Sequence, residues 1–121
     1  MILLKEVGWI VMKKNISIIR GDTYSFNFII EELLDNAYFS CKKTTNKDDT
    51  DYLFQKSLGD GISLVEETEE GKVYVVRVAP EDTHDIGKGN YYYDLQLEKN
   101  GDVFTPLIGR FKITDDITRE V

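Results

Sequence analysis

The residues best suited to chemistry stand around His84, with Glu81, Asp82 and Asp85 close by in the sequence. A histidine beside carboxylates could act as a general acid or base, or could help to hold a metal ion. Either role needs partners that converge from other segments, yet His84 is the only histidine, and no serine or cysteine is spaced to suggest a triad. Acids in a first helical turn are already explained by the helix dipole. We therefore expect no catalytic residue and no enzyme, and an enzyme or metal-dependent factor centred on His84 is our third hypothesis.

Three aspartates, Asp48, Asp49 and Asp51, could offer oxygen ligands to calcium. The stretch lacks the glycine and the distal glutamate of an EF-hand loop, so we expect no metal site here and no cofactor elsewhere. The single cysteine, Cys41, cannot form an internal disulfide, which fits a protein that matures in a reducing cytosol. It is expected to be a small buried apolar residue.

The tripeptide Arg20-Gly21-Asp22 could be a cell-adhesion motif or a turn between two strands. An adhesion motif would need the tip of an exposed protrusion, whereas here strand-forming residues flank the tripeptide on both sides. Gly21 permits a tight bend, and Asp22 could accept a hydrogen bond from a nearby backbone amide. The sequence favours the turn.

Composition narrows the class of protein. The chain has 121 residues, the size of one domain, and a formal charge of −7, which argues against binding to a phosphate backbone. No apolar run approaches the ~20 residues needed to span a bilayer, so we expect no membrane partner. The N-terminal stretch is a poor signal peptide because Lys5 and Glu6 interrupt it and no cleavage site follows.

Hydrophobic alternation with a period of two dominates the chain. Tyr24–Ile30 and Tyr91–Leu97 alternate most clearly, which is typical of strands with one buried face. Shorter or less regular candidates are Asn15–Arg20, Ala37–Lys43, Tyr52–Ser57, Ile62–Glu66, Lys72–Ala79 and Asp102–Thr114. The pattern predicts an all-β, immunoglobulin-like antiparallel β-sandwich of about seven to nine strands.

Turn signals separate these strands. Asn100-Gly101 is the strongest, because both residues tolerate the positive φ of a type I′ hairpin turn. Residues 80–87 read as one short helical turn, with Pro80 at its start and Gly87 at its close. Tyr91 then begins a strand and is expected to hydrogen-bond back to that turn, as in the tyrosine corner of immunoglobulin-like sandwiches.

Two features are candidates for interaction with other molecules. Alternation places Tyr92 on the outer face of its strand, between two inward tyrosines. Residues 1–14 form an N-terminal arm or extra strand ahead of a single domain at 15–121, and residues 1–11 are too apolar to remain a free tail unless Met12 is the true start. With Trp9 and Ile10, this arm is expected to pair with a sheet edge, either its own or that of a neighbouring copy.

The order of several motifs resembles a known family. The motifs are Arg20–Tyr24, Tyr38–Lys43, Val78–Thr83, Gly89–Leu97, Gly101–Phe111 and Asp115–Arg119. Together they resemble small β-sandwich structural proteins of tailed bacteriophages and prophages, and are similar to the N-terminal domain of phage baseplate upper proteins. Those proteins continue into further parts after this domain, while this sequence stops at Val121.

The resemblance implies a non-enzymatic virion structural or adaptor protein, in a baseplate, tail, neck or fibre anchor, made in the host bacterial cytoplasm. Its implied partners are other virion structural proteins, with a homo-oligomer as a further possibility and no nucleic acid. The alternative hypothesis is a stand-alone carbohydrate- or adhesion-type binding module built on the same sandwich.

Overall fold

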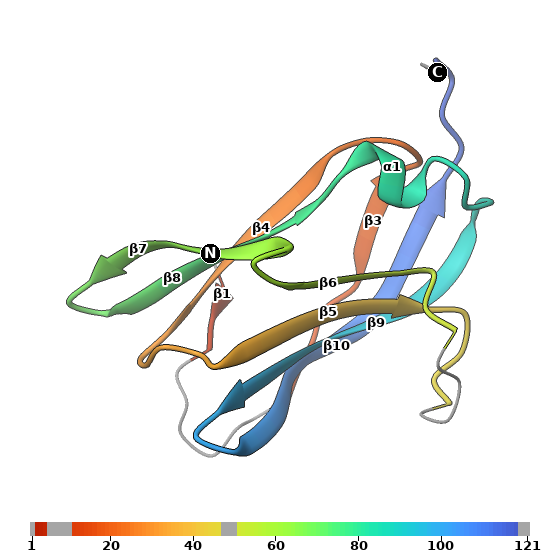
Figure 1. Cartoon of the computed structure of the whole chain (residues 1–121). Coiled ribbons are helices and arrows are strands. Elements are labelled where there is room, and N and C mark those ends of the chain that lie inside the picture. The colour runs from red at the N-terminus through yellow and green to blue at the C-terminus, as the bar shows by residue number, and fades with distance from the viewer. Residues whose placement is uncertain (1, 5–10, 47–50, 119–121) are drawn as a thin grey trace.

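The structure, a computed structural model, describes residues 2–4, 11–46 and 51–118, and this part of the chain is almost entirely β (Figure 1). In chain order the elements are β1 (Ile2–Leu3), β2 (Met12–Lys13), β3 (Ile16–Ile19), β4 (Tyr24–Ile30), β5 (Asn36–Lys42), β6 (Phe54–Leu58), β7 (Gly61–Thr68), β8 (Gly71–Val78), α1 (Pro80–Thr83), β9 (Gly89–Lys99) and β10 (Asp102–Thr114). The eight strands expected from the alternation are all present, with boundaries shifted by a few residues.

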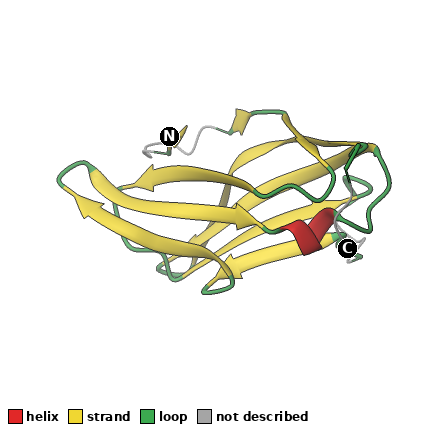
Figure 2. Ribbon diagram, turned by 90° about the horizontal axis from the view of Figure 1, so that it is seen from above, coloured by secondary structure: helices red, strands yellow, loops and turns green. Residues whose placement is uncertain are grey.

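The strands form two layers (Figures 1 and 2). One contains β1-β4-β8-β7 and the other β6-β5-β9-β10, with β2 and β3 at the outer edge of β10. A two-residue parallel contact between β6 and β7 connects the layers, and the long pairs within each layer are antiparallel. This order matches the two sheets of immunoglobulin-like domains. The chain is therefore an all-β, immunoglobulin-like antiparallel β-sandwich with one short helix, as the sequence predicted.

The core lies between the layers and follows the predicted alternation. Phe28 on β4 and Leu95 on β9 are fully buried, whereas Asn27 is exposed. Phe26 of the first sheet meets Phe39 of the second with ring centroids 5.6 Å apart, an edge-to-face contact that joins the two sheets. The side chains that the strand pattern assigns to the interior thus form one continuous core.

Short strands of the N-terminal segment form parallel pairs with one strand of each sheet. β1 pairs with β4, whereas β2 and β3 pair with β10. Gly109 allows this close approach, because a Cβ atom at that position would lie 2.0 Å from the carbonyl oxygen of Lys14. The described parts of the predicted arm, residues 2–4 and 11–14, therefore lie against the sheets of their own chain, whereas Trp9 and Ile10 lie outside the described residues.

The predicted hairpin turn at Asn100-Gly101 and the short helix that begins at Pro80 are both present, although the helix ends at Thr83 and not at Gly87. Asn100 and Gly101 have φ values of 51° and 83° and connect β9 to β10. The helix α1 begins at Pro80, and the hydroxyl of Tyr91 donates a 2.6 Å hydrogen bond to the carbonyl of Gly87. This bond is the predicted tyrosine corner, and it fixes the start of β9 against the loop that crosses between the sheets.

Candidate functional site

Among the acidic residues near His84, Asp82 supports the fold. The carboxylate of Asp82 accepts a 2.7 Å hydrogen bond from the backbone N–H of Ala79 and lies 2.7 Å from the ammonium of Lys56. These contacts cap α1 and tie it to β6. The Nδ1 atom of His84 lies 3.5 Å from a carboxylate oxygen of Asp85. Within the described residues, no three His, Cys, Asp or Glu side chains are grouped closely enough to hold a metal ion.

Within the described residues, neither the aspartates considered for calcium nor the single cysteine forms a metal or nucleophilic site. Asp48 and Asp49 lie outside that part of the chain, and Asp51 is exposed. Cys41 is fully buried, as expected, and burial raises its thiol pKa to about 12. A thiol that remains protonated at neutral pH is a poor nucleophile.

Arg20, Gly21 and Asp22 form a turn whose ends are held by the rest of the fold. The guanidinium of Arg20 donates two hydrogen bonds, of 3.1 and 2.9 Å, to one carboxylate oxygen of Asp116. Gly21 has a φ of 83° and donates its N–H to the hydroxyl of Thr83. The amide of Asp22 closes the turn by donating to the carbonyl of Ile19.

The side chain of Asp22 does not accept the backbone hydrogen bond that the sequence predicted. It is exposed and makes no hydrogen bond to another described residue, so its backbone, and not its carboxylate, closes the turn. With Arg20 held by Asp116 and only 20% exposed in its side chain, the tripeptide does not present a free arginine.

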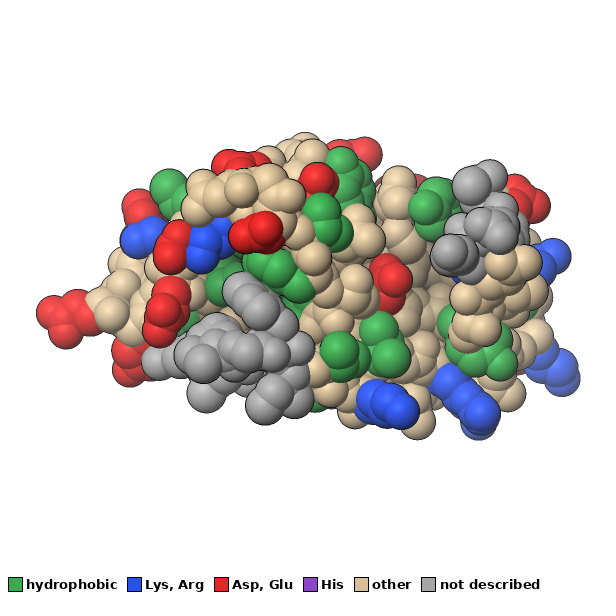
Figure 3. Space-filling model, turned by 90° about the horizontal axis from the view of Figure 1, so that it is seen from below, with side chains coloured by type: hydrophobic (Ala, Val, Ile, Leu, Met, Phe, Trp, Pro, Cys, Tyr) green, Lys and Arg blue, Asp and Glu red, His purple; other side chains and the backbone are tan. Residues whose placement is uncertain are grey.

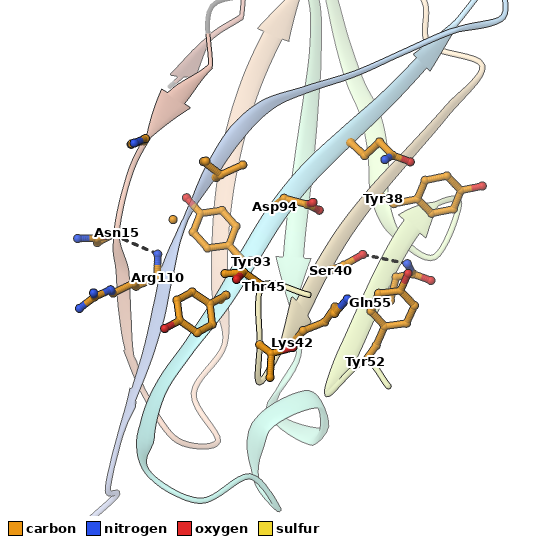
Figure 4. Close-up of a pocket in the computed structure, with 16 residues that line it drawn as sticks. Asn15, Tyr38, Ser40, Lys42, Thr45, Tyr52, Gln55, Tyr93, Asp94 and Arg110 are labelled. Carbon is orange, nitrogen blue, oxygen red and sulfur yellow. Dashed lines mark hydrogen bonds between the residues drawn. The ribbon is translucent and has the colours of Figure 1, made fainter. Parts of the chain in front are cut away.

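A broad concavity lies on the outer face of the second sheet (Figure 4). It has a volume of about 910 Å³ and runs across β6, β5, β9 and β10 to the segment that joins β2 to β3. Its lining is mostly polar and aromatic: Lys13, Asn15, Tyr38, Ser40, Lys42, Thr44, Thr45, Tyr52, Gln55, Tyr92, Tyr93, Asp94, Gln96, Ile108, Gly109 and Arg110. We call this surface the sheet groove.

Strand register brings the groove residues together in rows. Ser40 lies opposite Asp94 on β9, and the amide of Gln55 on β6 donates a 2.9 Å hydrogen bond to the Ser40 hydroxyl. In the next row Tyr92 stands between Lys42 on β5 and Arg110 on β10. Each row therefore combines side chains that are far apart in the sequence.

Lys42 organises the end of the groove nearest the loop that follows β5. Its ammonium donates a 2.7 Å hydrogen bond to the carbonyl of Asn46 and lies 5.7 Å from the ring centre of Tyr52, in a cation–π arrangement. The backbone amide of Arg110 donates a 3.1 Å hydrogen bond to the side-chain oxygen of Asn15, and Arg110 is itself exposed. Tyr92, at the centre of the groove, thus has one cation on each side, Lys42 and Arg110.

Asp94 is the only carboxylate that lines the groove within the described residues. Burial raises the pKa of its carboxyl above the ordinary value of 3.8, and the nearby ammonium of Lys42 partly opposes that shift. The lining holds Lys13, Lys42 and Arg110 against this one acid, three positive groups and one negative. The groove is therefore locally basic on a chain whose formal charge is −7.

Sequence reasoning identified one member of this site. Tyr92 was predicted to face outwards, and it lines the groove in a half-buried position. Tyr38, Lys42, Asp94 and Arg110 were missed, although the alternation of β5 and β9 already assigns the first three to outer faces. The alternation alone does not show which outward residues of neighbouring strands lie opposite each other.

No protein-family model matches the chain, and no curated protein matches it. Among solved structures, it is similar to the extracellular domains of the voltage-gated sodium channel β4 subunit, whose parallel homodimers were studied for a role in cell–cell adhesion. That likeness has 15% identity and a TM-score of 0.41 and covers 93% of this chain and 98% of the other.

A second structure, from work on cell-adhesive interactions of sodium channel β subunits, has 14% identity, a TM-score of 0.45 and the same coverage of 93% and 98%. Reduced rusticyanin has 18% identity and a TM-score of 0.40, covering 83% of this chain and 62% of the other. Likenesses this distant transfer no activity and no partner to this chain.

Proposed function

We propose that this protein is a non-enzymatic binding module that acts through protein–protein contacts made by the sheet groove. The observation that carries the proposal is the lining itself, in which tyrosines stand among cations and amides in a groove of about 910 Å³. Tyrosine and arginine are enriched where proteins bind one another, because each combines a large contact area with hydrogen bonding. The sandwich holds these side chains on four neighbouring strands, so they are positioned before any partner arrives.

The setting we propose for this module is the particle of a tailed bacteriophage or prophage, with other virion structural proteins as partners. Its support is the motif order described above, from Arg20–Tyr24 through Gly89–Leu97 to Asp115–Arg119. A virion protein made in the host cytoplasm needs no disulfide, and the single buried cysteine is compatible with that. An adaptor role needs a surface with defined hydrogen-bonding groups and no catalytic centre.

The second candidate is a carbohydrate- or adhesion-type binding module that uses the same groove. It is favoured by the three outward tyrosines, Tyr38, Tyr52 and Tyr92, which stand beside the hydrogen-bonding side chains of Gln55 and Gln96. A flat ring next to amides could hold a sugar face while the amides bind its hydroxyls. This candidate predicts a saturable small-molecule site, whereas the first predicts a macromolecular partner.

Two measurements test these proposals. Mass spectrometry of purified particles from the source of the sequence should find the chain in stoichiometric amounts, and its absence from washed particles would refute the virion setting. Mixing the purified chain with the other structural proteins of that particle, followed by light scattering, should give a complex that Tyr92→Ala weakens. Arg77→Ala on the outer face of β8 is the matched control, because Arg77 is exposed on the other sheet.

Glycan binding separates the two candidates. Saturable binding of a neutral oligosaccharide that is lost in Tyr92→Ala and kept in Arg77→Ala would favour the second candidate. A groove that binds a particle protein and no sugar would favour the first. Binding that is equal in both variants would show that the groove is not the site.

A further inference from the structure

The hairpin that connects β7 to β8 has a charge opposite to that of the sheet groove. Its tip contains four exposed glutamates, Glu66, Glu67, Glu69 and Glu70, and within it only Glu67 has a cation nearby, 3.2 Å from the ammonium of Lys72. In Figure 1 this hairpin projects away from the body of the sandwich. Acidic side chains gather at this end in Figure 3, whereas lysines and arginines predominate towards the opposite end of the face.

The base of the same hairpin also exposes apolar surface. The pairing of β7 with β8 shifts register between Leu64 and Glu66, and Leu64 and Val65 are 39% and 55% exposed. After Ile62, β7 has no further partner on its outer side among the described residues, so the strand forms a free edge. An acidic tip beside exposed aliphatic side chains is a suitable partner for a basic surface that carries tyrosines.

The groove supplies that complementary surface. Lys42 and Arg110 flank Tyr92, and Tyr52 is 45% exposed at one end. Although each copy carries a formal charge of −7, the basic groove of one copy and the acidic hairpin of another attract each other locally. The hairpin and the groove are different surfaces, which makes the contact head-to-tail.

We propose that the acidic β7–β8 hairpin of one copy of this chain binds in the sheet groove of the next copy. This inference rests on the proposed function, because it names the partner of the groove as a second copy. The glutamates pair with Lys42 and Arg110, while Leu64 and Val65 pack near the tyrosine rings. Since such a contact uses two different surfaces, it leaves one hairpin and one groove free in every dimer, and repeated addition gives a closed ring or an open filament.

Charge-reversed variants of the full chain test the proposal. The hairpin variant carries Glu69→Lys and Glu70→Lys, and the groove variant carries Lys42→Glu and Arg110→Glu. Sedimentation velocity over a range of concentrations should show self-association of the original chain and none of either variant alone. Arg77→Glu, an exposed reversal on the other sheet, should leave association unchanged.

A mixture of the two variants is the decisive measurement. The hairpin variant keeps an intact groove, the groove variant keeps an intact hairpin, and the two reversed surfaces are opposite in charge to each other, so the mixture should recover the association that each variant lacks alone. Raising the salt to roughly 0.5 M, where the Debye length is about 4 Å, should dissociate the mixed complex. Circular dichroism of each variant shows whether it remains folded.

Each result either supports or refutes the head-to-tail contact. An original chain that is monomeric at every concentration overturns the head-to-tail contact, and the proposed function survives if the groove still binds another particle protein. Self-association that resists both reversals places the contact elsewhere and also overturns this proposal. Loss of binding to every protein and to the second copy would refute the proposed function itself.

Discussion

Replacing Leu95 with alanine should destabilise the fold by about 2.5–5 kcal/mol. Leu95 is fully buried in the middle of β9, opposite Phe39 on β5 and Leu107 on β10. The substitution removes three carbon atoms, which costs about 2.4 kcal/mol at ~0.8 kcal/mol for each buried methylene. The cavity left behind adds a further term that depends on how far the neighbouring rings can relax, which gives the upper part of the range.

The control is Gln96→Ala, one residue along the same strand. Gln96 points to the outer face of the sheet, so its loss should change stability by less than about 0.5 kcal/mol. Urea denaturation, followed by tyrosine fluorescence and circular dichroism, should show a lower midpoint for Leu95→Ala with an unchanged slope. Equal losses for Leu95→Ala and Gln96→Ala would mean that β9 is out of register by one residue, because such a slip exchanges the two faces.

Three further predictions concern single contacts. Tyr91→Phe should destabilise the protein by about 0.5–1.5 kcal/mol in urea denaturation, because it removes the hydrogen bond to Gly87; an unchanged midpoint would show that the corner contributes nothing. Gly109→Ala should cost more than Tyr91→Phe in the same assay, because the new Cβ would collide with the carbonyl of Lys14, and a neutral result would mean that this segment does not lie on β10. Asp94→Asn should raise stability at pH 7 and change it little well below pH 3.8. Burial raises the carboxyl pKa of Asp94. The stability that this residue contributes is therefore present while the carboxyl is protonated and is lost as the pH rises through its folded pKa. Thermal melts at the two pH values measure this, and a loss of stability at pH 7 that is absent at the lower pH would indicate that the carboxylate makes a favourable contact.

The long strands and their turns could be predicted because local sequence specifies them. The alternation in β9 records which side chains are buried along the strand, and in β4 it does so up to Phe28, after which Ile29 and Ile30 are both buried. Asn100-Gly101 has few conformations available other than the turn it adopts. The helix at Pro80 and the hydrogen bond of Tyr91 are also local, since every group involved lies within one short loop.

The sequence predicted that the N-terminal arm pairs with a sheet edge, but it could not predict which strands β1 and β2 pair with. β1 and β2 contain two residues each and carry no periodic signal, so only their pairing with β4 and β10 defines them. The role of Gly109 was equally hidden, because nothing in the local sequence shows that the carbonyl of Lys14 passes above it. Such contacts depend on which distant segments meet, and a hydrophobic pattern does not contain that information.

The sheet groove also depends on which distant segments meet, and this explains why only Tyr92 was predicted from the sequence. Alternation states that Lys42, Tyr92 and Asp94 point outwards, but each could equally have faced a row of threonines. Their chemistry depends on register: β5 and β9 pair so that Lys42 lies opposite Tyr92, and β10 adds Arg110 on the other side. A shift of two residues in either pairing would keep every buried side chain in the core and yet separate the two cations from the ring. The core therefore constrains the fold far more than it constrains the site, and replacing Tyr92 or Arg110 should alter binding while leaving stability nearly unchanged.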